Sequence, residues 1–236
     1  MGISKSSTIK FAVKKSLPVL FGYLFLGSAF GIMLYEAGYN WIWAAFISLF
    51  VYAGSGQFLL VSLLSSAASL PTVAMMTLFV NSRHIFYGLS FVERFKKGGW
   101  RYPFMIFTLT DETYSVNVSF NEVPKDVDEI KARFIIGELN HLYWIAGSVI
   151  GSLAGQNIPI DFTGIDFSMT ALFVVIFVDL IRGGKSFKIC GAAGVLCALI
   201  CLMIFGADKF LLPSLILCCA VLLCGKPLID KERGNE

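Results

Sequence analysis

The sequence predicts an all-α integral membrane protein that forms one polytopic domain over residues 1–236. Of its residues, 56% are apolar and only 15% are charged, whereas soluble domains have about 45–50% and about 25%. Three consecutive apolar stretches also carry polar clusters near their midpoints, where hydrocarbon tolerates polarity least. The composition therefore excludes an ordinary soluble protein, and the clusters indicate a polar path through a membrane, which is typical of transport.

About eight apolar stretches are long enough to cross a bilayer, which takes roughly 20 residues per helix. They are predicted at residues 17–35, 41–66, 69–92, 103–120, 134–155, 164–181, 188–206 and 209–224. Together they use most of the chain, so no separate soluble core is expected. The second, third and fourth helices are expected to be interrupted at the bilayer midplane, because their polar clusters lie there.

The first stretch follows four lysines, so the positive-inside rule predicts a cytoplasmic N-terminus. A signal peptide is the alternative, because an apolar run directly follows Lys14 and Lys15. However, Gly27 and Gly31 form a small-residue face of the kind that packs membrane helices closely. This face favours a first helix that is retained.

Loop charges agree with eight full spans except at one place. Counting from an inside N-terminus puts the C-terminus and the basic loops 121–133 and 182–188 inside. The loop 93–101 would fall outside, although it carries four basic residues. If one interrupted segment were re-entrant, this loop could return to the cytoplasm, and a second non-spanning segment would then keep the later loops inside.

The second stretch carries Gly54, Ser55, Gly56 and Gln57 in sequence. A helix with two glycines so close is easily unwound. Unwinding exposes backbone N–H and C=O groups that can hold a ligand's carboxylate or ammonium, as in many transporters. Gln57 adds a neutral donor and acceptor. The alternative is tight helix packing through small residues.

The third stretch places Asn81 and His84 on one helical stripe, with Arg83 turned away from it. Arg83 keeps its charge, so it needs a carboxylate or a hydrated anion as partner. One interpretation is an ion pair with Asp111 or Glu112 in the fourth stretch. The other is an anchor for a substrate carboxylate, and the two are compatible.

The fourth stretch carries Asp111 and Glu112 on adjoining helix faces, followed by Thr113. An acid inside a membrane is a candidate proton carrier, and His84 could relay the same proton. The alternative is that both acids only neutralise Arg83.

A metal site or a cofactor is not expected. Glu138 and His141 have the E-x-x-H spacing that forms half of a di-metal helix motif, but no second copy occurs. The six cysteines lie in the last two apolar stretches and form no CxxC pair. We therefore expect a protein that is not an enzyme. An intramembrane enzyme with a His/Glu site and a non-transporting scaffold subunit remain as alternatives.

The three polar clusters together resemble the AzlC family. The matching runs are G-S-x-Q-F at 54–58, N-x-R-H-x-x-Y-G-L-S at 81–90 and T-D-E-T at 110–113. The resemblance implies the large subunit of a bacterial exporter of branched-chain amino acids, driven by the proton motive force, with a small AzlD-type membrane partner. We therefore expect a secondary transporter of branched-chain or other small apolar amino acids. From the residues themselves, its site is predicted at Gly54, Ser55, Gly56, Gln57, Asn81, Arg83, His84, Asp111, Glu112 and Thr113, with Asp111, Glu112 and His84 as proton-coupling candidates.

Overall fold

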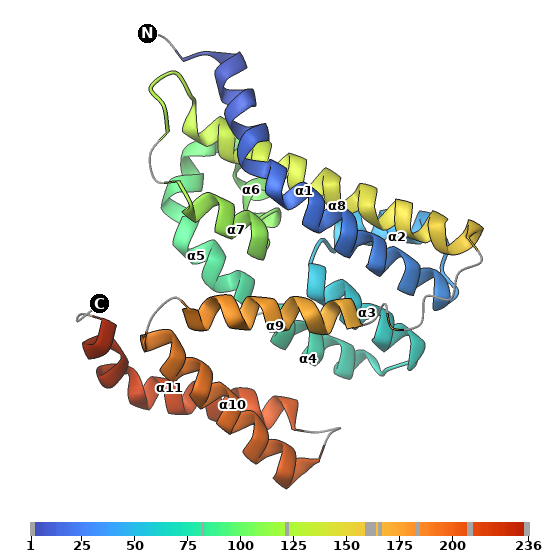
Figure 1. Ribbon diagram of the computed structural model, residues 1–236, viewed down its shortest axis with the longest axis vertical. Helices are drawn as coiled ribbons and strands as arrows, with labels where there is room; N and C mark the ends of the chain where they lie inside the picture. Colours follow the sequence, from blue (N-terminus) through green and yellow to red (C-terminus); the bar gives the residue numbers. More distant parts are fainter. Residues whose placement is uncertain are drawn as a thin grey trace. The chain divides into compact units, whose positions relative to one another are not determined.

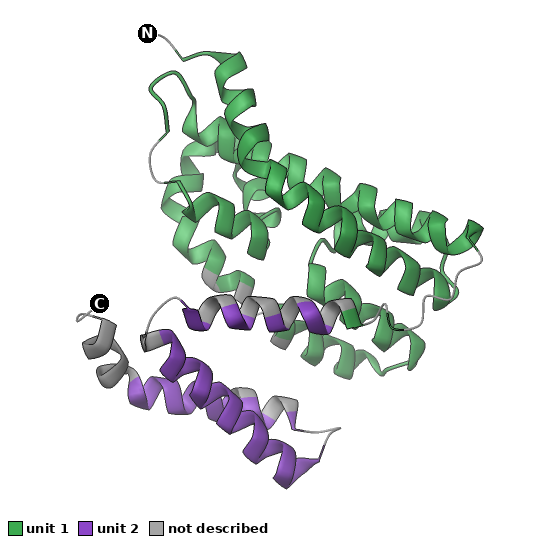
Figure 2. Cartoon of the chain, in the orientation of Figure 1, with its two compact units in different colours: residues 1–169 green, residues 170–236 purple. Residues whose placement is uncertain are grey.

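The computed structural model describes residues 3–81, 83–120, 123–158, 164, 167–182, 185–206 and 210–233. Helices are the only regular elements of these residues (Figure 1). The chain divides into two compact units, residues 1–169 and 170–236 (Figure 2).

The first unit contains α1 to α8 and a short 3-10 helix, η1. Their bounds are α1 Lys5–Glu36, α2 Trp41–Phe50, α3 Gly54–Ser65, α4 Leu70–Asn81, α5 Arg83–Phe95, η1 Lys96–Arg101, α6 Tyr102–Phe107, α7 Asp111–Val118 and α8 Glu129–Asn157. The helix α9 (Phe167–Arg182) crosses the boundary between the units, and the second unit continues with α10 (Lys185–Phe205) and α11 (Leu211–Arg233).

The frame of the first unit is the pair α1 and α8, which run side by side over most of their length (Figure 1). Glycines make this contact close enough for backbone to touch backbone. A Cβ added at Gly31 would overlap the Ser148 carbonyl oxygen, and one at Gly147 would lie 2.6 Å from the Tyr23 carbonyl oxygen. The small-residue face predicted at Gly27 and Gly31 is thereby confirmed, and Gly147 supplies the matching face on α8, as expected for close packing of membrane helices.

The N-terminal ends of α1 and α8 lie together, and the basic loop joins them there. The Ser4 amide donates to the Asp126 carbonyl at 2.8 Å. Arg94 lies 3.6 Å from the Glu129 carboxylate. The Trp100 ring packs edge-on against the Phe134 ring, which lies on α8 just over one turn after Glu129. The loop 93–101 thus lies at the same end of the unit as the N-terminus, although eight full spans would put it at the opposite end.

The predicted span 103–120 consists of two short helices. The first, α6, follows α8 inward: the Phe104 ring lies 5.6 Å from that of Phe134, and the Phe107 ring lies 5.5 Å from that of His141. The chain then turns at Thr108–Thr110, where the helix α7 begins. Seven residues of α8 rise about 10 Å, so α6 reaches only about a third of a 30 Å hydrocarbon thickness.

The second short helix, α7, returns along α8 in the opposite direction. Near its start, the Asn140 amide donates to the Thr113 hydroxyl at 3.0 Å. Near its end, the buried Arg133 guanidinium donates to the Asn117 carbonyl at 2.7 Å. The helices α6 and α7 therefore form a hairpin that enters and leaves at the N-terminal end of α8.

The predicted span 41–66 is also divided, because α2 ends at Phe50 and α3 begins at Gly54. Its turn meets the turn of the α6–α7 hairpin beside α8. The Tyr52 ring lies 6.0 Å from that of Phe107 and 4.3 Å from that of His141. Two helix breaks far apart in sequence thus come together at one position along α8.

The second unit contains apolar helices that expose large hydrophobic side chains. Of the described residues, two helices are long and apolar enough to cross a membrane, Lys5–Glu36 in the first unit and Phe187–Phe205 in the second. On the latter, Met203 is 87% exposed. The six cysteines are free thiols, of which Cys197 and Cys201 are buried.

Candidate functional site

A buried cluster of polar side chains lies where the two helix breaks meet. We call it the central polar cluster, and its members are Tyr23, Tyr52, Thr110, Glu112, Thr113 and Asn140. The Tyr23 hydroxyl lies 2.6 Å from the Thr110 hydroxyl and donates to a Glu112 carboxylate oxygen at 2.7 Å. The cluster thus joins α1, α7 and α8 through hydrogen bonds around one carboxylate.

The polar groups of α7 lie in the cluster because the sequence starts this helix beside it. Thr110 caps α7, because its hydroxyl accepts from the Thr113 amide. Threonine is a favoured N-cap residue. The acids Asp111 and Glu112 occupy the first turn, where the helix dipole favours negative charge. The T-D-E-T run is therefore both a helix start and the means of holding two acids inside the unit.

One buried acceptor of the cluster is left over. The Asn140 side-chain oxygen has no hydrogen-bond partner among the described residues. Leaving such a group unpaired costs about 1–3 kcal/mol. In the same cluster, Tyr52 has a φ of 36°, which is unusual for a bulky residue. Such costs are typical of functional sites, and they indicate a site that can take a polar ligand.

Asp111 faces a second set of side chains, on the α4–α5 side of α7. It accepts a hydrogen bond from the Tyr87 hydroxyl at 2.6 Å. The Tyr87 ring packs edge-on against His84, whose Nδ1 lies 3.2 Å from the Asn81 carbonyl oxygen. The two adjacent acids therefore accept hydrogen bonds from two different tyrosines, as expected for side chains on adjoining helix faces. The Arg83 side chain lies outside the described residues.

Asn81 also contacts the first turn of α3. A Cβ added at Gly56 would lie 2.9 Å from both terminal atoms of the Asn81 side chain. Gly54 opens the same turn with a φ of +25°, a conformation that glycine adopts readily. Ser55 is buried beside it. The predicted residues at 54–56 and Asn81 are thus brought together at one helix start.

Gln57 belongs to a separate buried network. Its side-chain oxygen accepts from the Trp144 indole at 2.7 Å, and its amide donates to the Ser48 hydroxyl at 3.2 Å. The Ser48 hydroxyl in turn donates to Ser148 at 2.8 Å. Because both ends of Gln57 are engaged by α2 and α8, its observed contacts are those of a residue that holds helices together.

Replacing Trp144 by Phe should lower the stability of the first unit by about 1–3 kcal/mol, since it removes the donor to Gln57 in a buried place. The ring contacts with Tyr23 and Phe30 should be kept in part. Thermal unfolding in detergent measures the change. Trp100→Phe is the matched control, because Trp100 is 79% exposed. Equal midpoints for the two variants would contradict the role of the indole.

The E-x-x-H pair does not lead to a metal site in the part of the chain that is described. His141 is buried, and its Nε2 lies 3.1 Å from the Ser48 carbonyl oxygen. Glu138 is half-buried on the same helix. Among the described residues, no group of three His, Cys, Asp or Glu side chains is placed to hold a metal ion.

The structure thus brings the predicted residues whose side chains it describes into four groups around the two helix breaks. Glu112 and Thr113 lie in the central polar cluster, and Asp111 and His84 lie around Tyr87. Gln57 lies in the Trp144 network, and residues 54–56 lie with Asn81 at the start of α3. Sequence reasoning missed Tyr23, Tyr52 and Asn140. A signal existed for Tyr23, because it lies four residues before Gly27 on the small-residue face, where a polar side chain must be buried.

Comparison with known proteins places the chain among membrane proteins. The AzlC protein family matches residues 18–158. A Helicobacter pylori relative named uncharacterized membrane protein is 40% identical over 208 residues, covering 88% of this chain and 90% of the relative. A Bacillus subtilis relative, named branched-chain amino acid transport protein AzlC, is 35% identical over 219 residues, covering 92% and 85%.

The Escherichia coli inner membrane protein YgaZ is 26% identical over 230 residues, covering 93% of this chain and 89% of the relative. No solved structure matches the chain. The family match covers more than half of the chain and includes all three polar clusters. The apolar helices and the names of the relatives are consistent with a membrane protein. The chain belongs to the AzlC family.

Proposed function

We propose that this protein is a secondary transporter that exports branched-chain or other small apolar amino acids across the bacterial cytoplasmic membrane in exchange for protons. One observation carries the proposal: α7 starts with two adjacent acids, each held by a tyrosine of a different helix, next to an unpaired buried acceptor. Family membership supports amino-acid transport, and the name of the B. subtilis relative favours transport over catalysis.

The fold suggests how the chain crosses the membrane. In our proposal α1 and α8 span fully from the cytoplasm, and the α6–α7 hairpin is re-entrant from the cytoplasmic side. If the α2–α3 segment is re-entrant from the opposite side, the basic loop 93–101 and the N-terminus both lie in the cytoplasm, as the charge rule requires. The two re-entrant turns then meet at His141, and non-helical backbone is permitted there because protein surrounds it.

In this arrangement, the substrate binds between the two helix starts. Backbone N–H groups at Gly54–Gly56 and the Arg83 side chain would receive the carboxylate of the amino acid. The ammonium would meet Glu112 and the Asn140 side-chain oxygen. Asp111, Glu112 or His84 would then exchange a proton with the transport cycle, because carboxylates and imidazoles inside membranes serve as proton relays.

A small membrane partner of the AzlD type belongs to the proposal. The direct test is counterflow of labelled leucine or valine in proteoliposomes that hold the purified chain with and without such a partner. We expect labelled amino acid to accumulate in at least one of these two conditions. Correctly folded protein that moves neither amino acid in either condition would refute the proposed function.

A further inference from the structure

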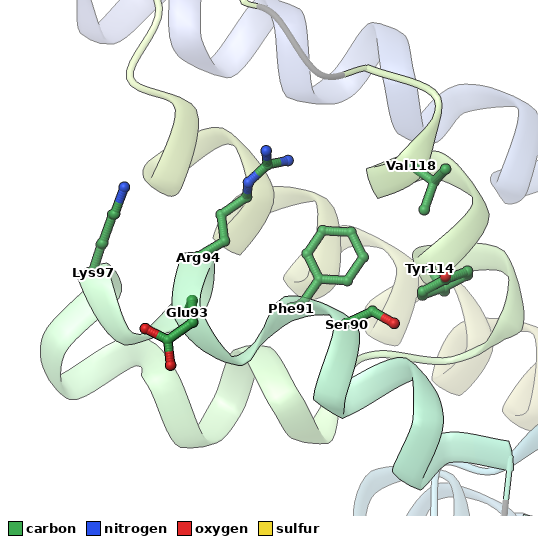
Figure 3. A pocket seen from close by; sticks show the side chains of 7 residues that line it. All are labelled: Ser90, Phe91, Glu93, Arg94, Lys97, Tyr114 and Val118. Carbon is green, nitrogen blue, oxygen red and sulfur yellow. The ribbon is translucent and has the colours of Figure 1, made fainter.

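A cavity of about 510 Å³ opens between α5, η1 and α7 in the first unit (Figure 3). This volume falls within the about 300–1,000 Å³ of small-molecule sites. Its polar lining includes Ser90, Arg94 and Lys97, and its apolar lining is Phe91, Tyr114 and Val118. The cavity therefore has one cationic wall and one aromatic and aliphatic wall.

The cationic wall is formed by two side chains one helical turn apart. Arg94 and Lys97 point the same way, whereas the Glu93 carboxylate points to the opposite side (Figure 3). Glu93 accepts a hydrogen bond from Lys96 at 2.9 Å. Arg94 lies 3.6 Å from Glu129. The charged residues that line the cavity are two cations, Arg94 and Lys97, and one acid, Glu93, so the lining carries a net positive charge.

The apolar wall of the cavity is connected to the candidate site through a series of aromatic ring contacts. The Phe91 ring packs edge-on against the Tyr114 ring, with ring centres 5.6 Å apart. The Tyr114 ring in turn stacks on the Tyr87 ring, with ring centres 4.5 Å apart. The Tyr87 hydroxyl donates to Asp111. A single pair of stacked rings therefore separates the cavity from the first acid of α7.

We infer that this cavity is the cytoplasmic mouth of the transport path, a first binding site for an amino acid with an aliphatic side chain. The substrate carboxylate meets Lys97 and Arg94, and its side chain meets Phe91 and Tyr114. The Tyr87–Tyr114 stack then acts as the gate between this mouth and Asp111. This inference rests on the proposed function, because it gives that function its point of access.

The test compares two lysines that are adjacent in sequence but differ in position. Lys97→Gln removes a charge from the cavity, and Lys96→Gln removes one from outside it. Lys96 is cationic in the wild type like any exposed lysine, and its hydrogen bond with Glu93 raises the pKa of its ammonium group further. Initial rates of leucine uptake into inverted membrane vesicles give KM and Vmax for both variants and the wild type.

We expect Lys97→Gln to raise the KM for leucine about three- to fivefold with Vmax unchanged, which is the effect of losing one exposed charge pair. Lys96→Gln should leave KM at the wild-type value. Wild-type transport with equal KM in both variants would overturn this inference alone, whereas absence of wild-type transport would refute the proposed function. A KM effect that vanishes in liposomes without anionic lipid would assign the cavity to a lipid headgroup and also overturn the inference.

Discussion

Glu112→Gln is expected to abolish uphill transport while keeping exchange. The variant keeps the size of the side chain and an oxygen that can accept from Tyr23, but it cannot carry a proton. We expect the rate of leucine movement driven by a pH gradient to fall on the order of 100-fold or more, as is typical when a proton-transferring group is removed. Counterflow of labelled leucine against unlabelled leucine should continue, because it needs no net proton movement.

The matched control for this variant is Glu36→Gln. The Glu36 side chain is exposed at the C-terminal end of α1, so it tests the same chemical change outside the unit's interior. It should leave both pH-driven transport and counterflow near the wild-type rates. If Glu112→Gln drives leucine uphill as fast as the wild type, Glu112 is not the proton carrier, and Asp111→Asn becomes the variant to measure.

Gly31→Ala is expected to destabilise the first unit strongly. The added methyl group would overlap the Ser148 carbonyl oxygen and lie 2.6 Å from the Ser152 amide nitrogen, so the backbones of α1 and α8 must separate. Overpacking in a well-packed interior costs about 1–3 kcal/mol and occasionally more. Here the obstacle is backbone rather than a movable side chain, so we expect the upper end. Thermal unfolding in detergent, followed by size-exclusion chromatography, measures the loss.

Gly22→Ala on the same helix is the control, because nothing lies within 4 Å of a Cβ added there. Alanine is favoured over glycine in helices by about 1 kcal/mol. Gly22→Ala should therefore leave the unfolding midpoint unchanged or raise it slightly. A Gly31→Ala protein as stable as Gly22→Ala would show that the close contact between α1 and α8 does not hold in the membrane protein.

The sequence alone was sufficient to predict the helical class and the close-packing face of α1, because hydropathy and small-residue spacing are local properties of a helix. It also indicated where helices start, since the hydroxyl of Thr110 and the acids that follow it are a local capping signal. The basic loop 93–101 indicates re-entrant segments from the sequence alone, and the return of α7 along α8 to Arg133 is consistent with that interpretation.

The partners of the acids could not be predicted, because they come from elements distant in sequence. Tyr23 is 89 residues from Glu112, and Tyr87 is 24 residues from Asp111. No spacing rule along one helix connects such pairs. The contacts of Gln57 depend likewise on Trp144, which lies 87 residues away in the sequence. Local sequence patterns were sufficient to identify the polar positions, whereas the partners of those residues follow from tertiary contacts between distant segments.

In the proposed mechanism, an acid of α7 couples amino-acid export to proton movement. The decisive measurement records the pH inside proteoliposomes, with a trapped pH-sensitive dye, while a leucine gradient is imposed. We expect leucine moving in one direction to drive protons in the other in the wild type, and Glu112→Gln protein to move leucine in exchange without a pH change. Wild-type protein that transports leucine at full rate with no leucine-dependent pH change would contradict it.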